Sequence, residues 1–360
     1  MKKSIYVITG ASGHLGNVVV KKLLDRGANV RVLMVEDEIP PSLEGLDLQI
    51  VRGNLSSRAD LERLFQGLNG LDIYVLHMAS MITIDSQVSP LVEKVNVTGT
   101  ELLLDLALEH KAKRFLYCSS VHAIPEKKYN APISEVTAFD PAWVEGAYAK
   151  TKAMASQAVL DASKKGLDVV LVHPSGIIGP YDYEHNNYLN QTVRDFLRGK
   201  LTTLVQGGYD FVDVRDVADG LLAALFQGDS GESYILSGHY LSIEDLIKLA
   251  AKASGRTPIR RVLRLGLVKL FVPLVEWWGK LRKRRPLYTA YSLYTLNANA
   301  NFSHAKASAR LGYHPRPLKE TVEDTVQFIR DQASQGSLGE KLKMKLADIH
   351  MVPHRQRPLP

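Results

Sequence analysis

Ile5-Tyr6-Val7-Ile8-Thr9-Gly10-Ala11-Ser12-Gly13-His14-Leu15-Gly16 is the stretch that decides the fold of this chain. Its apolar, β-branched first half predicts a buried strand, and apolar residues at helical spacing over 18–24 predict a helix after it. Gly10 lets the chain turn sharply, Gly13 lets a pyrophosphate approach the backbone, and Gly16 lets the helix lie close to the strand. The free N–H groups and dipole of the helix N-terminus attract phosphate, so the stretch predicts a dinucleotide site.

The glycine spacing, Gly-x-x-Gly-x-x-Gly, resembles the opening of the extended short-chain dehydrogenase/reductase superfamily. Further stretches carry the same resemblance along nearly the whole chain to about residue 330: His77-Met78-Ala79-Ser80, Val95–Thr100, Leu116–Val121, Tyr148–Lys152, Val172–Pro180 and Asp210–Gly220. Within the superfamily the chain resembles the NAD-dependent epimerase/dehydratase family. Its pattern is closest to the branch of dihydroflavonol reductases and 3β-hydroxysteroid dehydrogenases.

Strands and helices alternate with short connections in the first half of the chain. The expected strands are Ile5–Thr9, Val30–Met34, Leu48–Val51, Ile73–Leu76 and Arg114–Cys118. This order predicts an α/β fold. Its main part is a doubly wound parallel sheet, which is a Rossmann fold, and a smaller, mostly helical part is expected to bind the substrate. The expected division is 1–175 and 207–235 for the dinucleotide-binding domain, 176–206 and 236–330 for the substrate-binding part, and 331–360 for a basic C-terminal tail.

The end of the second strand governs the choice between NAD and NADP. Met34 and Val35 stand there, with Glu36 and Asp37 just beyond. No cation is within reach in the sequence, and two carboxylates would repel a 2′-phosphate, so NAD is favoured over NADP. The resemblance implies these cofactor-binding residues: Gly10, Ser12, Gly13, His14, Leu15, Gly16, Asn54, Leu55, Met78, Ala79, Ser80, Tyr148, Lys152, Pro174, Ser175 and Ile177. Asn54 stands where the family usually has Asp, and its carbonyl oxygen is expected to accept a hydrogen bond from the adenine amino group.

Tyr148 and Lys152 form a Tyr-x-x-x-Lys pair at the start of a predicted helix, where residues four apart share one face. An ammonium stabilises a phenolate, so Lys152 is expected to lower the pKa of Tyr148 below its ordinary value of about 10. Tyr148 would then exchange a proton with a substrate hydroxyl or carbonyl as hydride moves to or from the nicotinamide. The resemblance adds Ser120 as the third catalytic residue, bonded to the same substrate oxygen, and makes Asn96 mainly a structural brace.

Two departures from the family pattern bear on the substrate. Relatives that act on nucleotide sugars usually carry an Arg just before Asp210 and an Asn at the position of Gly176, whereas this chain has Tyr209 and Gly176. Loss of the Arg removes a bidentate phosphate clamp, which disfavours a nucleotide sugar. The resemblance to the dihydroflavonol reductase and 3β-hydroxysteroid dehydrogenase branch implies instead an apolar ring substrate that bears a hydroxyl or a ketone. Aromatic residues over 181–188 could line an apolar pocket or lie in surface loops, and His122 could touch the substrate or have no role.

Composition narrows the location and the partners. The chain has 360 residues, a net charge of +7 and a single cysteine, Cys118, which suits a reducing compartment. The N-terminal apolar run is broken at Gly10 and lacks a cleavage pattern, so a cytoplasmic protein is expected. Basic residues gather at 280–285 and 341–357 without a nucleic-acid motif, so no nucleic-acid partner is predicted. No metal site is predicted either. The apolar and basic segment 264–285 could be a peripheral membrane contact, a pocket lid or a dimer surface.

These residues together predict an NAD(P)-dependent oxidoreductase that interconverts a secondary alcohol and a ketone, on a hydrophobic cyclic small molecule. The alternative enzyme is a sugar or nucleotide-sugar epimerase or dehydratase with tightly held NAD. A third alternative is a nucleotide-sensing regulator without catalysis, against which the joint presence of Ser120, Tyr148 and Lys152 argues. The resemblance also implies a homodimer.

Overall fold

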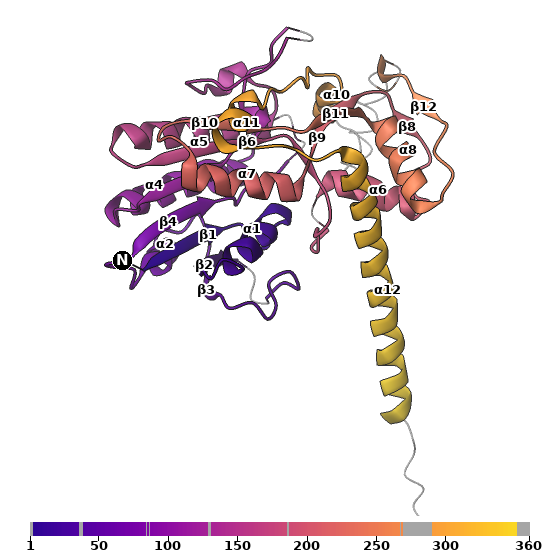
Figure 1. Cartoon of the computed structure of the whole chain (residues 1–360), viewed down its shortest axis with the longest axis horizontal. Helices are drawn as coiled ribbons and strands as arrows, with labels where there is room; N and C mark the ends of the chain where they lie inside the picture. The colour runs from indigo at the N-terminus through magenta and orange to yellow at the C-terminus, as the bar shows by residue number, and fades with distance from the viewer. Residues whose placement is uncertain are drawn as a thin grey trace, which may run out of the picture.

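A seven-stranded sheet forms the centre of the molecule in a computed structural model that describes residues 3–35, 39–83, 85, 87–128, 131–185, 187–266, 268 and 290–350. The strand order is β10-β6-β5-β4-β1-β2-β3, and every neighbouring pair is parallel (Figure 1). The strands are β1 (Ser4–Thr9), β2 (Asn29–Met34), β3 (Gln49–Arg52), β4 (Asp72–His77), β5 (Arg114–Cys118), β6 (Val169–Pro174) and β10 (Ser233–Leu236). The predicted doubly wound Rossmann fold is confirmed.

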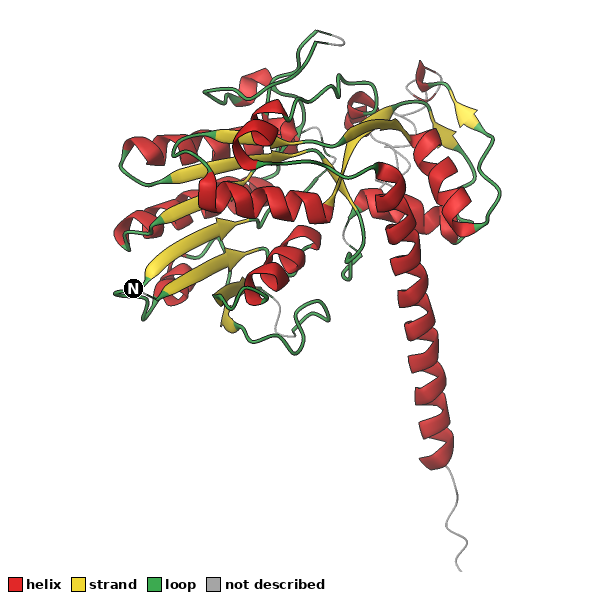
Figure 2. Ribbon diagram, viewed as in Figure 1, coloured by secondary structure: helices red, strands yellow, loops and turns green. Residues whose placement is uncertain are grey.

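Helices cover both faces of this sheet (Figure 2). One face packs against α2 (Arg58–Phe65), α4 (Gly99–Glu109) and α5 (Ala147–Lys164), and the other against α1 (His14–Leu24), α7 (Val214–Gln227) and α11 (Ala305–Leu311). Because both faces are covered, the central strands are apolar on both sides, which explains why they read as continuous apolar runs in the sequence.

The strand order places three predicted site segments side by side. The chain runs outward from β1 to β2 and β3 and then crosses back to β4 on the other side of β1. The loops after β1 and β4 therefore diverge, which leaves a ligand crevice at the carboxyl ends of these strands. The glycine turn follows β1, Ser80 follows β4 and Ser120 follows the next strand, β5.

The smaller part contains two small sheets as well as helices. One sheet joins β7 (Gly176–Ile178), β9 (Gly208–Asp213) and β11 (His239–Ser242), and the other pairs β8 (Leu204–Val205) with β12 (Val262–Leu263). Its helices are α6 (Tyr188–Leu197), α8 (Ile243–Ser254) and α10 (Ala290–Thr295). Apolar residues of α6, α8, β9 and the first turns of α12 form a separate core there.

Helix α12 (Leu318–His350) begins against α6 and α8, and its later turns extend away from the rest of the molecule (Figure 1). Residues 331–350, expected as part of a basic tail, are helical. Further helical turns among the described residues include α3 (Pro90–Glu93), a π-helix over Lys94–Thr98, and 3₁₀ turns at Val121–Ala123 and Pro141–Trp143. Apart from 264–266 and 268, the segment 264–285 lies outside the described residues. Within the described part of the chain, no helix has both the length and the apolar character that crossing a bilayer requires.

Candidate active site

The glycine turn has the geometry that a dinucleotide needs. Gly10 has a φ of +78°, and a β-carbon there would lie 2.6 Å from the backbone nitrogen of Ala79. A β-carbon on Gly16 would lie 1.9 Å from the Gly10 carbonyl oxygen, so the helix can approach the strand only as glycine. Gly13 is the N-cap of α1, with no side-chain cap and no acidic residue in the first turn of the helix. This helix N-terminus therefore fits a pyrophosphate, which its backbone N–H groups would bind.

His14 connects the glycine turn to the smaller part of the molecule. Its Nε2 lies 2.8 Å from the Pro180 carbonyl oxygen and its Nδ1 lies 2.9 Å from Nδ2 of Asn187. Burial lowers the pKa of His14, which keeps the ring neutral. Since both ring nitrogens are occupied by the chain itself, His14 has its backbone N–H to offer a cofactor, together with those of Leu15 and Gly16 at the helix start.

The adenosine end of the site differs from the sequence expectation in two respects. Arg52, the last residue of β3, is in register with Met34, the last residue of β2, so a cation does stand beside the strand end that governs cofactor choice. The Asn54 carbonyl oxygen already accepts hydrogen bonds from the backbone nitrogen and hydroxyl of Ser56, at 2.9 and 3.0 Å. Its amide NH₂ is thus the group left for adenine, contrary to the expectation that the oxygen would serve.

The other residues predicted to bind or select the cofactor differ in their surroundings. Glu36 and Asp37, on which the preference for NAD was based, lie outside the described residues. Leu55 is buried in the core, against Gly99. Met78, Ala79 and Ser80 lie partly exposed in the loop after β4, beside the glycine turn. In the turn after β6, the Ser175 hydroxyl donates to Asp210 at 2.5 Å, beside Pro174, and Ile177 packs on the core.

The three predicted catalytic residues come together at the carboxyl end of β5. The Tyr148 phenol lies close enough to the hydroxyls of Ser120 and Ser80 for both to affect its pKa. Lys152, one helical turn later on α5, is buried, and its Nζ lies 6.0 Å from the centre of the Tyr148 ring. Nζ donates to the Cys118 carbonyl oxygen at 2.7 Å and to the Tyr117 hydroxyl at 3.3 Å. One of its three N–H donors thus remains for a ribose hydroxyl.

The pKa of Tyr148 shifts in the direction opposite to the one that the sequence predicted. Burial raises it above the ordinary value for tyrosine, while the Ser120 and Ser80 hydroxyls oppose the rise. The Lys152 ammonium donates its hydrogen bonds to Cys118 and Tyr117 rather than to the Tyr148 phenol. Burial in turn lowers the pKa of Lys152 to about 8. In this structure, Tyr148 is therefore a protonated phenol over the neutral range.

A buried group of polar side chains lies next to Lys152. Thr100 lies near the Tyr117 hydroxyl, and its Oγ1 donates to the Asn96 carbonyl oxygen at 2.7 Å. His77 lies between Thr100, 2.8 Å from Nε2, and Thr9, 2.6 Å from Nδ1. Because the Thr100 hydrogen is committed to Asn96, Thr100 must accept from His77, which assigns the proton to Nε2. Burial lowers the pKa of His77 to about 3, so the ring stays neutral.

Asn96 is the brace that the resemblance implied, and it sits in the π-helix. Its Oδ1 accepts from the backbone nitrogen of Met81 at 2.7 Å, and its Nδ2 donates to the Met81 carbonyl oxygen at 3.0 Å. The same Nδ2 donates to Thr151 Oγ1 at 3.1 Å. Asn96 thereby links the loop that carries Ser80 to the helix that carries Tyr148.

An aromatic pocket opens beside this group of residues. Its wall includes His122, Trp143, Tyr209, Tyr291 and Tyr294, which the strands and α10 bring together from distant parts of the chain. The centre of the His122 ring lies 6.3 Å from that of Tyr148 and 6.4 Å from that of Tyr291. Sequence reasoning missed Tyr291 and Tyr294, since no local motif marks them.

The aromatic cluster over 181–188, one of the candidates for a pocket wall, lies elsewhere. Tyr183 packs edge-on against Phe328 of α12, with ring centres 5.2 Å apart, and Tyr181 contacts the same ring. Lys21 lies 4.7 Å above the Tyr183 ring. These contacts place the cluster between α1 and α12, away from the aromatic pocket.

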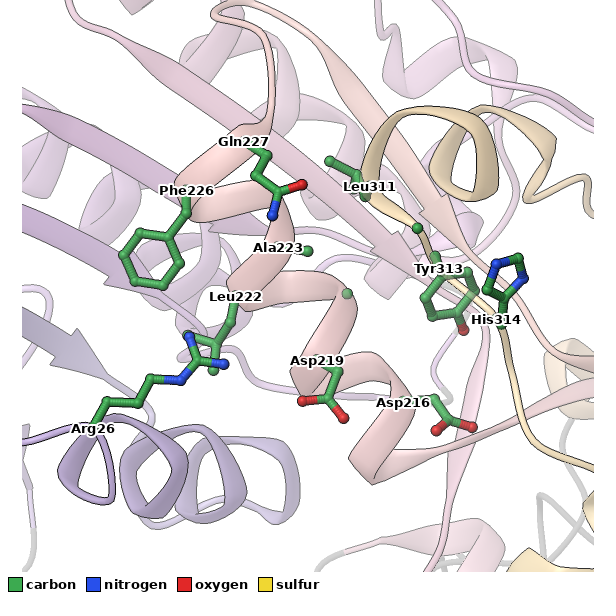
Figure 3. A pocket seen from close by; sticks show the side chains of 12 residues that line it. Arg26, Asp216, Asp219, Leu222, Ala223, Phe226, Gln227, Leu311, Tyr313 and His314 are labelled. Atoms are coloured by element: carbon green, nitrogen blue, oxygen red, sulfur yellow. The ribbon is translucent and has the colours of Figure 1, made fainter.

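A second groove, on the outer face of α7, is separate from the active site (Figure 3). Arg26, Asp219, Phe226, Tyr313 and His314 are among the residues that line it, and none of the predicted catalytic or cofactor-binding residues does. Among the described residues, no group of three or more His, Cys, Asp or Glu side chains could hold a metal ion.

A profile of the NAD-dependent epimerase/dehydratase family matches residues 6–237, which include the glycine turn and all three catalytic candidates. The chain belongs to this family. The predicted membership in the extended short-chain dehydrogenase/reductase superfamily is thereby confirmed, and this family member is an NAD(P)-dependent enzyme that acts on CH–OH groups.

Similar proteins cover almost the whole chain. It is 28% identical over 332 residues to sterol demethylase protein B of Methylococcus capsulatus, covering 91% of this chain and 98% of that protein. It is 28% identical over 337 residues to 4-hydroxy-2-methyl-3-oxo-4-farnesyl-3,4-dihydroquinoline-1-oxide ketoreductase of Stigmatella aurantiaca, covering 92% and 98%. The crystal structure of gox2253 superposes with a TM-score of 0.78 at 29% identity, covering 92% of this chain and 99% of that one.

Proposed function

We propose that this family member is an oxidoreductase that interconverts a secondary alcohol and a ketone on a hydrophobic cyclic substrate. One observation carries the proposal. The Tyr148 phenol lies close to the Ser120 hydroxyl at the edge of the crevice, next to a pocket lined by aromatic residues. The names of two relatives, a sterol demethylase protein and a quinoline-oxide ketoreductase, support an apolar ring substrate.

The proposed roles follow from the geometry of the chain's own residues. The nicotinamide, when bound, supplies or takes up the hydride. Ser120 donates a hydrogen bond to the substrate oxygen and holds it in line with the phenol. Tyr148 gives its proton to that oxygen as the carbonyl carbon gains the hydride, or takes the proton when an alcohol loses it. Lys152 places a buried positive charge near the phenol and one N–H toward the ribose.

The protonated state of Tyr148 favours ketone reduction as the working direction near neutral pH. A phenol whose pKa is raised by burial is a ready proton donor, whereas alcohol oxidation needs the phenolate. We expect the ratio of alcohol oxidation to ketone reduction to rise steadily from pH 7 to pH 10. A ratio that stays constant over this range would contradict the assignment of Tyr148 as the group that exchanges the proton.

NAD is the proposed cofactor, with NADP as the alternative. Glu36 and Asp37 follow β2 in the sequence and support NAD, while Arg52 beside Met34 offers a cation to a 2′-phosphate. We expect Arg52→Gln to weaken NADPH binding about tenfold and to leave NADH binding unchanged, because the ribose hydroxyl of NADH carries no charge. Titration of both nucleotides against the purified variants measures this difference.

The epimerase alternative has less support at the positions that would bind a sugar diphosphate. Tyr209 stands in place of the family's Arg and bonds through its hydroxyl to Thr295. A β-carbon on Gly176 would lie 2.9 Å from the Asp210 carbonyl oxygen, so an Asn there would require the backbone to move. Net change in free nicotinamide absorbance during turnover separates the two activities, because an epimerase returns the hydride to its own product.

Replacement of the phenol tests the proposed function directly. Tyr148→Phe is expected to abolish turnover of cyclic ketones while nicotinamide nucleotides bind as before, since the ring stays and the proton is lost. Tyr188→Phe, on the partly exposed start of α6, is the matched control and should retain full activity. Absence of turnover of any alcohol or ketone by the wild type would favour the non-catalytic nucleotide sensor.

Two partner proposals come from the sequence alone. A homodimer is proposed from the family resemblance, and light scattering of the purified chain measures it. Peripheral membrane contact is proposed for 264–285, where Trp277 and Trp278 precede a basic cluster. Co-sedimentation with anionic vesicles should decrease when both tryptophans are replaced by Ser, and no binding by the wild type would refute the contact.

A further inference from the structure

Tyr291 stands in the aromatic pocket with an unused hydroxyl. The residue belongs to α10 and is buried, with 8% of its surface exposed. Its hydroxyl has no hydrogen-bond partner among the residues that the structure describes. Burial raises the pKa of Tyr291, and Tyr148, Tyr209 and Glu145 are near enough to add to the rise. The group is therefore a neutral phenol that belongs to the wall of the aromatic pocket, close enough to the catalytic tyrosine for the two phenols to interact.

The two other tyrosines that line this pocket are already satisfied. Tyr294 donates to Oε2 of Glu126 at 2.5 Å, and the Tyr209 hydroxyl is bonded to Thr295. Leaving a buried hydroxyl without a partner costs free energy, so such groups in native proteins are usually bonded. Among the described residues, Tyr291 differs from these two neighbours because its hydroxyl has no partner, and an oxygen of a molecule in the pocket would supply one.

We infer that the Tyr291 hydroxyl binds a second oxygen of the substrate, remote from the reacting carbon, so that the enzyme selects neutral ring compounds bearing two oxygens. The inference rests on the proposed function, because it takes Tyr148 to mark the reacting end of the pocket. The His122 ring packs near both tyrosines, with ring centres 6.3 Å from Tyr148 and 6.4 Å from Tyr291, so the two phenols belong to one group of packed rings.

The charge of the pocket supports a neutral ligand. Glu126 and Glu145 line it, and among the described lining residues no Lys or Arg balances them. Burial lowers the pKa of His122 to about 4, so this ring adds no positive charge near neutral pH. Carboxylates repel a phosphate or carboxylate on an incoming molecule, so the pocket disfavours coenzyme A thioesters and nucleotide sugars.

The test compares three probes of one shape. These are a neutral tetracyclic ketone with a hydroxyl on the distant ring, the same ketone without that hydroxyl, and the hemisuccinate ester of the first. Binding to the full-length protein is measured by calorimetry in the presence of reduced nicotinamide nucleotide, and turnover is measured in parallel. The variants are Tyr291→Phe and the control Tyr188→Phe, which removes a hydroxyl from the partly exposed start of α6.

The wild type should bind the hydroxylated ketone about tenfold more tightly than the deoxy ketone, and Tyr291→Phe should erase this ratio. Tyr188→Phe should keep the ratio, and the hemisuccinate should bind most weakly. An unchanged ratio in Tyr291→Phe, or the tightest binding by the hemisuccinate, would overturn the inference. If the probes bind in the expected order but none is turned over, the proposed function fails while the second oxygen site stands. If the probes are turned over but the binding ratio does not depend on Tyr291, the proposed function stands and the second oxygen site fails.

Discussion

The ring of Tyr291 lies directly on Gly146, the residue before the helix that carries the catalytic tyrosine. A β-carbon on Gly146 would lie 2.2 Å from Cε2 of Tyr291, and Gly146 has φ and ψ of 92° and 153°, a conformation that is essentially restricted to glycine. Gly146→Ala therefore combines backbone strain with a steric clash, and we expect it to lower the free energy of unfolding by about 3 kcal/mol or more. Urea denaturation measures the loss.

Gly166, just beyond the other end of the same helix, provides the control for that substitution. It also has a positive φ, of +95°, but a β-carbon there would meet nothing within 4 Å. Gly166→Ala should therefore cost only the backbone strain, about 1–2 kcal/mol. Equal losses in the two variants would mean that the contact between Gly146 and Tyr291 does not constrain the helix start.

Gly13 and Gly16 should separate cofactor binding from folding. The nearest contact of a β-carbon on Gly13 is the Gly10 carbonyl oxygen at 3.4 Å, and the backbone there has an ordinary φ of −66°. Gly13→Ala should leave stability within about 0.5 kcal/mol of the wild type, yet weaken nucleotide binding at least tenfold, because the methyl group faces the phosphate position. Gly16→Ala should lose both stability and binding. Nucleotide titration and thermal unfolding of the two variants test the distinction.

Thr100 is hydrogen-bonded with His77 and Asn96 and lies near Tyr117, in the buried polar group next to Lys152. Thr100→Val keeps the shape but leaves the Nε2–H of His77 without this partner and places a methyl group near the Tyr117 hydroxyl, which should cost about 1–3 kcal/mol of stability. It should also shift the pH dependence of turnover, because the Tyr117 contact to Lys152 loosens. Thr98→Val, on the exposed side of the same segment, should change neither quantity. A pH profile identical to that of the wild type would show that the buried polar group serves packing alone.

Burial of Lys152 predicts a specific dependence of stability on pH. Its pKa is about 8 in the folded chain against 10.5 for an ordinary lysine, so between these values the unfolded chain binds more protons than the folded one. The free energy of unfolding should therefore rise with pH across this window, by up to about 3 kcal/mol from this group. Lys152→Met should remove that rise and Lys150→Met should not, when unfolding is measured without added nucleotide. A rise that persists in Lys152→Met would assign it to other groups.

Much of the fold could be predicted because its signals are local. The apolar run before Gly10 and the apolar residues at helical spacing after Gly16 define β1 and α1 without any tertiary information. The same holds for the central strands of the sheet, such as β4, β5 and β6, which carry continuous apolar runs because helices cover both faces. Tyr148, Lys152 and Ser120 could be found because the family spacing places each at a strand or helix end.

The pocket could not be predicted, because its wall is assembled from segments far apart in the chain. Tyr291 and Trp143 carry no motif, whereas the aromatic cluster over 181–188 looked like a pocket wall and packs against α12 instead. The direction of the Tyr148 pKa shift was also beyond the sequence. A phenol and an ammonium four residues apart share a helical face, but the burial of both groups and the hydrogen bond of Lys152 to Cys118 depend on the packed strands.

Sequence alone determined the Rossmann sheet, the glycine turn and the order of the catalytic residues, since strand hydrophobicity and motif spacing are properties of short segments. Only the tertiary structure decided the charge states at the site, the cation that Arg52 brings beside Met34, and the partnerless phenol of Tyr291. The physical reason is that desolvation and hydrogen-bond satisfaction depend on which distant segments pack together, and no local pattern encodes that neighbourhood.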